Sequence, residues 1–168
     1  MGAMRTGVTS DAVRVLVSVL PLVLVAACAS EPQSRPAAPP HVSKTAADQA
    51  AGQAAKMVGR PYRFGGSSPS AGFDCSGLVQ YSYRHAGIAL PHNTERQRSA
   101  SRLVKVADLR RGDLLFFHQE GKKHGHVGIY LGGGKFVHAP SSGKNVRSDR
   151  LDSPYWKKHL TEARRLAV

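Results

Sequence analysis

The chain has 168 residues, of which 41% are hydrophobic and 21% charged. This length is typical of one domain with a short appendage, and the composition excludes a chain that is disordered throughout. Lysine and arginine outnumber aspartate and glutamate by 24 to 11, for a formal net charge of +13. We therefore expect an anionic partner such as nucleic acid, acidic lipid headgroups or bacterial cell-wall polymers.

The N-terminus has the pattern of a bacterial secretory signal. An apolar run from Val15 to Ala27 follows two arginines, and it is too short to span a bilayer, which takes about 20 apolar residues. The run ends in Val25-Ala26-Ala27-Cys28, which resembles a lipobox. We expect residues 1–27 to be a lipoprotein signal peptide and Cys28 to be the lipidated N-terminus of the mature chain.

Ordinary signal cleavage is the alternative, because Ala27-Cys28-Ala29 also fits an A-x-A cleavage site. Both routes export the protein. We expect a lipoprotein of the bacterial cell envelope, held in the outer membrane where there is one, or otherwise a secreted protein. Export removes nucleic acid from the candidate partners.

Residues 28–45 are expected to form a linker behind the lipidated cysteine. Four prolines lie among alanine, serine and glutamine there, a composition that favours an extended chain over a packed core. The folded domain is predicted over residues 46–168. Lipidation of Cys28 leaves Cys75 without a partner, and a lone thiol in an oxidising compartment is a candidate reactive group.

Helical signals come first within the domain. Helices are predicted over residues 46–58, from Asp74 or Cys75 to about His85 with a stop at Gly87, and over residues 94–100, and a Gly- and Ser-rich loop is predicted over residues 62–71.

Strand signals follow the helices. Short apolar segments bounded by Gly, Pro or Asp predict strands over residues 114–117, 127–131, 136–139 and 145–148, while residues 160–166 fit a strand or a helix. Helices followed by strands, without alternation, favour an α+β domain whose N-terminal helices pack on an antiparallel sheet.

Cys75 is predicted at the start of the second helix, where the helix dipole favours a thiolate. The dipole contributes about 0.3 to 2 kcal/mol. Lowering the pKa of a thiol from about 8.5 to about 5 takes roughly 4.8 kcal/mol. We therefore expect a cationic histidine beside the sulfur.

His126 and His138 are the candidates for that partner. His126 opens a strand whose residues Val127, Ile129 and Leu131 share the other face, and Gly128 is expected to keep the histidine face open. The chain returns through Phe136-Val137-His138 after three glycines, as in a hairpin. An odd loop or a bulge places both histidines on one face, whereas a two-residue loop separates them.

If the two histidines share a face, Cys75, His126 and His138 form a nucleophile, a base and an orienting residue, as in papain-like enzymes. The backbone N–H of Cys75 then helps to bind the oxyanion.

Five motifs, in this order, resemble the NlpC family of bacterial cell-wall cysteine peptidases. The resemblance covers about residues 46–166. The motifs are Pro61-Tyr62-Arg63-Phe64-Gly65-Gly66, Phe73-Asp74-Cys75-Ser76-Gly77-Leu78-Val79, Arg111-Gly112-Asp113-Leu114-Leu115-Phe116-Phe117, His126-Val127-Gly128-Ile129-Tyr130 and Phe136-Val137-His138-Ala139.

The resemblance implies a papain-like fold and hydrolysis of peptide bonds in peptidoglycan stem peptides, typically between a D-γ-glutamyl residue and a diamino acid. It assigns the catalytic roles to Cys75, His126 and His138. It also places the hydroxyl of Tyr62 near the nucleophile, and Asp74 and Ser76 along the substrate cleft. We expect a monomer that uses no cofactor and no metal.

Two features depart from the family pattern: His92 stands where the family often has arginine, and residues 119–125 are a polar, basic insertion before the base. Both affect the choice of bond rather than the triad.

Two alternatives stay open at this point. His124 and His126 could share a strand face and bind zinc, with His118 or His138 nearby. The same fold could also serve as a non-catalytic scaffold that binds the wall.

Overall fold

The computed structural model describes residues 44–119, 121–140 and 143–166. The predicted signal peptide, the lipidated Cys28 and most of the predicted linker lie outside these residues. Within the described ranges, no helix is long and apolar enough to cross a membrane.

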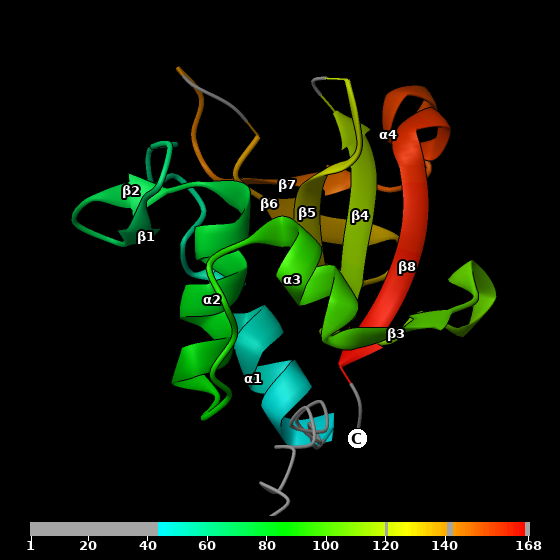
Figure 1. Ribbon diagram of the computed structural model, residues 1–168, viewed down its shortest axis with the longest axis horizontal. Helices are drawn as coiled ribbons and strands as arrows, with labels where there is room; N and C mark the ends of the chain where they lie inside the picture. Colours follow the sequence, from blue (N-terminus) through cyan, green and yellow to red (C-terminus); the bar gives the residue numbers. More distant parts are fainter. Residues whose placement is uncertain (1–43, 120, 141–142, 167–168) are drawn as a thin grey trace, which may run out of the picture. The chain divides into compact units, whose positions relative to one another are not determined.

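A six-stranded antiparallel sheet is the centre of the domain (Figure 1). Its strands follow the order β3-β8-β4-β5-β6-β7 across the sheet. The bounds are β3 Ser101–Val104, β4 Leu114–Gln119, β5 Lys122–Gly132, β6 Lys135–His138, β7 Arg147–Arg150 and β8 Leu160–Leu166. A separate two-stranded pair joins β1 Ser67–Ser68 to β2 Gly72–Phe73, within and just after the segment predicted as a loop.

Helices cover both faces of this sheet. The described helices are α1 Lys44–Ala55, α2 Cys75–His85, α3 Thr94–Ser99, the 3-10 turn η1 Val106–Asp108 and α4 Pro154–His159. Core residues of α1 and α2 belong to one hydrophobic cluster, and Trp156 of α4 belongs to the other. The predicted α+β domain with an antiparallel sheet is confirmed.

Alternation along β4 separates the two clusters. Leu114 and Phe116 belong to the cluster under α1 and α2, whereas Leu115 and Phe117 belong to the cluster under α4, and all four are fully buried. Successive side chains of a strand point to opposite faces, so one four-residue apolar run supplies both cores.

Helix α2 begins and ends where the sequence predicts. Asp74 is the N-cap residue, and its carboxylate accepts a hydrogen bond from the backbone N–H of Gly77 at 2.6 Å. Ala86 closes the helix, and Gly87 follows with a φ of 80°. A left-handed residue after the last turn favours glycine because it has no Cβ.

The β5–β6 hairpin has the register that brings the two histidines together. Ile129 pairs with Val137 and Tyr130 with Phe136, and a bulge then shifts the pairing to Gly132 and Lys135. The three glycines of the loop have φ values of 92°, 59° and 72°, conformations that other residues rarely adopt. This is the bulged arrangement that the sequence left as one of two possibilities.

Besides the β1–β2 pair, the elements β3, η1 and α4 were not predicted. Residues 160–166 form a strand, β8, and α4 immediately precedes it. Strand β8 carries four charged or polar residues, Thr161, Glu162, Arg164 and Arg165, which hide its two-residue period. It is nevertheless an interior strand, paired with β3 on one side and β4 on the other.

Candidate active site

Cys75 is held at the start of α2 by close contact between two glycine-containing segments. The N–H of Asp74 donates to the carbonyl oxygen of Gly66 at 3.0 Å. A Cβ on Gly77 would lie 2.0 Å from that same oxygen. Any larger residue at position 77 would therefore separate the helix from the loop, which gives the Gly65-Gly66 and Cys75-Ser76-Gly77 motifs a packing role.

Asp74 holds several donors at once. Its carboxylate caps α2, accepts from the N–H of Gly65 at 2.9 Å and from the Ser76 hydroxyl at 3.1 Å, and lies 2.8 Å from Nε2 of His92. The predicted cleft residues Asp74 and Ser76 are thus bonded to each other beside Cys75. His92, the departure from the family pattern, contacts Asp74 directly.

The Cys75 thiol is surrounded by protein on most sides. Its sulfur lies 3.9 Å from the hydroxyl oxygen of Thr94. Burial raises the pKa of the Cys75 thiol above its ordinary value, and the nearby carboxylate of Asp74 raises it further. Hydrogen bonds from the backbone N–H of Val127, the Thr94 hydroxyl and the backbone N–H of Ser76 act in the opposite direction on this pKa.

His126 and His138 form a buried hydrogen-bonded pair. Nε2 of His126 lies 2.8 Å from Nδ1 of His138, and the two rings meet edge to face. His126 is 2% exposed and His138 is fully buried. The hairpin register puts both rings on one face of the sheet, as the bulged alternative predicts.

Gly128 does not leave that face open, contrary to the prediction from sequence. A Cβ at this position would lie 2.8 Å from the ring of Phe136 and 3.3 Å from Cβ of His138. Glycine is therefore needed because the neighbouring strand packs directly against it. The space beside His126 is filled rather than hollow on this side.

The sequence reasoning missed two residues behind the histidine pair, Asp149 of β7 and Trp156 of α4. Nε2 of His138 lies 3.1 Å from Oδ2 of Asp149. The indole N–H of Trp156 and the guanidinium of Arg147 donate to the same oxygen, both at 2.8 Å. The Ser153-Pro154 pair, a typical helix start, was the one sequence signal for α4. No local signal joins Asp149 to His138.

Aromatic side chains enclose the pair. The ring of Trp156 stacks on His126 at a centroid distance of 5.8 Å and meets His138 edge to face at 4.8 Å. Phe117 lies 6.0 Å from His126, and Phe136 lies 4.9 Å from His138. These aromatic side chains form a box that buries both imidazoles.

Burial in the box favours neutral imidazoles. It lowers the pKa of His126 well below its ordinary value, and the neighbouring His138 lowers it further. Burial also lowers the pKa of His138, to about 4, even though the bond to Asp149 acts in the opposite direction. These pKa shifts oppose the cationic histidine that the sequence led us to expect beside a thiolate.

A cleft of about 730 Å³ brings most of the predicted site residues together. Cys75 and His126 line it, and so do Tyr62, Asp74 and Ser76. His138 lies behind His126 and outside the lining. In the described residues of the site, Cys75 and His126 share the cleft without a hydrogen bond between them.

The basic insertion forms part of the cleft wall. Lys122 and Lys123 are exposed and line the cleft together with Gln119 and His124. The insertion lies where β4 turns into β5, and its pairing is shifted by an irregularity after Phe117.

The contacts of His124 and His126 do not favour the zinc alternative, because the two side chains bond to different protein partners. Nδ1 of His124 lies 2.9 Å from the hydroxyl of Thr161, and its Nε2 lies 3.6 Å from Glu162. His126 instead contacts His138. No group of three or more potential metal ligands occurs in the described part of the chain.

Comparison with known proteins places this arrangement in a family. The sequence model of the NlpC/P60 family matches residues 59–165. The chain belongs to the NlpC/P60 family. This confirms the resemblance inferred from the five motifs.

Relatives in the NlpC/P60 family are named as endopeptidases. The probable endopeptidase YafL of Escherichia coli K12 is 44% identical over 115 residues, which are 66% of this chain and 46% of that protein. The bifunctional muramidase/DL-endopeptidase CwlT of Bacillus subtilis is 43% identical over 116 residues, which are 68% of this chain and 35% of that protein.

A solved structure supports the fold. A lipoprotein-like NLP/P60 family protein from Staphylococcus aureus superimposes with a TM-score of 0.67 at 37% identity, over 80% of this chain and 45% of that one. The matched region spans less than half the length of each of these three relatives.

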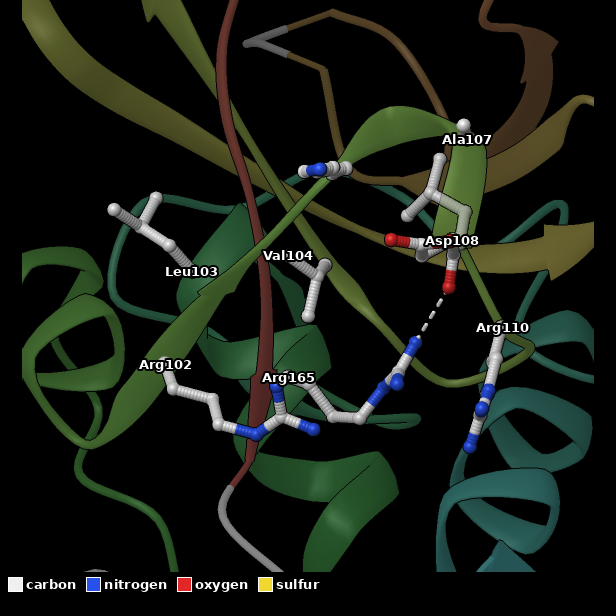
Figure 2. Close-up of a pocket in the computed structure, with 9 residues that line it drawn as sticks. Arg102, Leu103, Val104, Ala107, Asp108, Arg110 and Arg165 are labelled. Carbon is white, nitrogen blue, oxygen red and sulfur yellow. Dashed lines mark hydrogen bonds between the residues drawn. The ribbon is translucent and has the colours of Figure 1, made fainter.

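A second recess, of about 520 Å³, lies between β3, η1 and β8 (Figure 2). Arg102 and Arg165 are direct cross-strand partners in it, and Lys105 and Arg110 also line it. Arg165 donates to the carbonyl oxygen of Asp108 at 2.8 Å. The described residues around this recess include no cysteine or histidine, so it offers a basic surface and no nucleophile.

Proposed function

We propose that this NlpC/P60 protein is a cysteine endopeptidase that hydrolyses peptide bonds in peptidoglycan stem peptides. The observation that carries the proposal is the cleft that Cys75 shares with His126, with His138 bonded behind His126. The endopeptidase names of the relatives support it. No cofactor is part of the proposal.

The proposed bond lies between a D-γ-glutamyl residue and a diamino acid. The name DL-endopeptidase of the Bacillus subtilis relative CwlT supports this choice. A relative from Escherichia coli is named murein DD-endopeptidase MepH, so the family includes more than one named specificity. His92 and the wall formed by Lys122 and Lys123 are the differences in this chain that bear on the choice.

In the proposed first step, Cys75 Sγ attacks the carbonyl carbon while Nδ1 of His126 takes the thiol proton. The raised pKa of the thiol and the lowered pKa of His126 keep that proton on sulfur until substrate binds. His126 therefore acts as a general base during attack rather than as half of a stable ion pair. The backbone N–H of Cys75 donates to the developing oxyanion.

The remaining steps return the enzyme to its starting state. The C–N bond breaks as His126 gives its proton to the leaving amine, which leaves a thioester on Cys75. Water then attacks the thioester carbon, His126 takes the proton of that water, and the C–S bond breaks as the thiol is reprotonated. His138 orients the base throughout. Tyr62, Asp74 and Ser76 contact the substrate along the cleft.

The proposal also covers location. Residues 1–27 are a lipoprotein signal peptide, Cys28 is the lipid-modified N-terminus, residues 28–45 are the linker and residues 46–168 the peptidase domain, which acts as a monomer at the membrane of the cell envelope. The lipobox pattern supports this division. The intact mass of the mature protein tests it, since Cys28→Ala should remove an acyl-modified N-terminus.

Inhibition separates the proposal from its alternatives. Solubilisation of purified sacculi by the chain should stop after alkylation by iodoacetamide and continue in a metal chelator. Loss of activity in the chelator, reversed by zinc, would favour the zinc hydrolase. Binding to sacculi without any solubilisation would favour the non-catalytic scaffold.

A further inference from the structure

Asp149 ends a chain of hydrogen bonds that starts in the cleft. The chain runs from His126 through His138 to Oδ2 of Asp149. We propose that Asp149 is a positioning residue that fixes the tautomers of both histidines, so that Nδ1 of His126 is free to accept the proton of Cys75. This inference rests on the proposed function for its consequence in catalysis, but not for its geometry.

The carboxylate of Asp149 can only accept hydrogen bonds. Burial raises the pKa of Asp149, but the hydrogen bonds from Trp156, Arg147 and His138 together lower it by more, so the net shift is downward. Oδ2 therefore accepts from the Trp156 indole N–H and the Arg147 guanidinium, at 2.8 Å each. Neither donor is able to take a proton from it.

The proton positions follow from this starting point. Because Oδ2 only accepts, the proton of a neutral His138 lies on Nε2, and its Nδ1 is an acceptor. Nε2 of His126, 2.8 Å away, must then carry the proton of that ring. A neutral His126 is left with an unprotonated Nδ1. The tautomer of each histidine is thus set by the hydrogen-bond partner behind it: Asp149 sets that of His138, and His138 sets that of His126.

The two histidine rings are too deeply buried for water to take the place of Asp149 as their hydrogen-bond partner. His138 is fully buried and His126 is 2% exposed, and the aromatic box lies around both rings. The orienting oxygen must therefore come from the protein.

Two elements hold Asp149 in place. In the pairing of β6 with β7, Phe136 lies opposite Asp149 and His138 lies opposite Arg147. Trp156 approaches the same carboxylate from α4. The β7–α4 segment has no recognisable motif, yet it carries Asp149 and holds its carboxylate against His138.

Substitution by leucine and by asparagine separates the loss of an acceptor from the loss of side-chain volume. The bonds from His138, Trp156 and Arg147 all end on Oδ2 of Asp149. In Asp149→Asn, the amide oxygen in that place still accepts from all three donors, and both rings keep the wild-type tautomer. Asp149→Leu fills a similar volume without an acceptor, so Nε2 of His138 faces only the Trp156 and Arg147 donors. Nε2 is then the acceptor, both rings adopt the other tautomer, and Nδ1 of His126 carries a proton.

We therefore expect Asp149→Leu to lower kcat by at least about 100-fold with little change in KM, because the base then lacks an unprotonated Nδ1. Asp149→Asn should keep kcat within about 10-fold of the wild type, because its amide oxygen still accepts from His138. A folded Asp149→Leu variant with wild-type kcat would contradict the role of Asp149. Asp152→Asn is the matched control, because Asp152 pairs with Arg150 at the surface and should leave kcat unchanged.

Nitrogen-15 NMR of histidine-labelled full chain gives a readout that does not depend on turnover. The wild-type and Asp149→Asn spectra should show both rings protonated on Nε2, and Asp149→Leu should move both protons to Nδ1. Identical tautomers in wild type and Asp149→Leu would overturn the inference even if the wild type is active. A wild type without activity but with the expected switch would overturn the proposed function and leave this inference standing.

Discussion

The Cys75 thiol is half-buried and the His126 imidazole is buried, and desolvation moves their pKa values in opposite directions. The thiol pKa rises and the imidazole pKa falls, so both groups are neutral near pH 7. Sequence reasoning placed both residues correctly in one cleft but assumed a cationic histidine, because the aromatic box depends on Trp156, which lies far along the chain. The residues were predictable and their protonation was not.

The two histidines should differ in how much activity depends on them. His126→Ala removes the base, and we expect kcat/KM to fall by about 10³-fold or more. His138→Gln should cost about 10-fold, because the amide oxygen still accepts from Nε2 of His126. Kinetics on a stem peptide, with circular dichroism to confirm folding, measures both. Equal losses in the two variants would contradict an orienting role for His138.

Elements with strong local signals were predicted best. Helix α2 is delimited by Asp74 and Gly87, and the β5–β6 hairpin is delimited by three glycines. Strand β3 was missed because Arg102 and the exposed Leu103 give it no clear alternation. Helix α4 has six residues, and its position is defined by packing against the sheet rather than by its own sequence.

The β5–β6 strand pair should tolerate no side chain at position 128. A Cβ there would lie 2.8 Å from the Phe136 ring and 3.0 Å from the Val137 carbonyl oxygen. Gly128→Ala should therefore lower the free energy of unfolding by about 1 to 3 kcal/mol. It should also lower kcat, because the shift displaces His138 relative to His126.

Gly52→Ala in α1 is the matched control, since its Cβ would meet only the Arg111 side chain, at 3.8 Å. It should raise the free energy of unfolding by up to about 1 kcal/mol and leave kcat unchanged. Denaturant titration of both variants measures the difference. A Gly128→Ala variant as stable as Gly52→Ala would contradict the close packing of these strands.

On the scale of the whole molecule, the buried histidine pair links folding to pH. Unfolded histidines have a pKa near 6.5, whereas His138 has a pKa of about 4 in the folded chain, and the His126 pKa is also lowered. Below pH 6.5 the unfolded chain binds protons that the folded chain does not. The free energy of unfolding should therefore decrease as the pH falls from about 6.5 to about 4.

Fluorescence of Trp156, the only tryptophan of the chain, follows this unfolding because its ring lies on the histidine pair. His138→Gln should make the dependence on pH less steep. A free energy of unfolding that stays constant between pH 6.5 and 4.5 would contradict the burial of neutral histidines.

The net charge of +13 should help the protein to bind the anionic polymers of the cell wall. We expect binding of the Cys75→Ser chain to purified sacculi to weaken between about 50 and 500 mM salt, because screening shortens electrostatic attraction. Combined Arg102→Gln and Lys105→Gln at the second recess should weaken binding more than Lys157→Gln and Lys158→Gln on α4. Co-sedimentation measures this, and binding that does not vary with salt would remove charge as its cause.

Mass spectrometry of purified peptidoglycan fragments, incubated with the chain or with its Cys75→Ser variant, tests the proposed hydrolysis directly. The expected result is cleavage between the D-γ-glutamyl residue and the diamino acid, at a rate at least about 10³-fold higher with Cys75 than with serine. Cleavage by both proteins would show that Cys75 is not the nucleophile. If neither protein cleaves the fragments although both are folded, the chain is not an endopeptidase that can hydrolyse stem peptides without another factor.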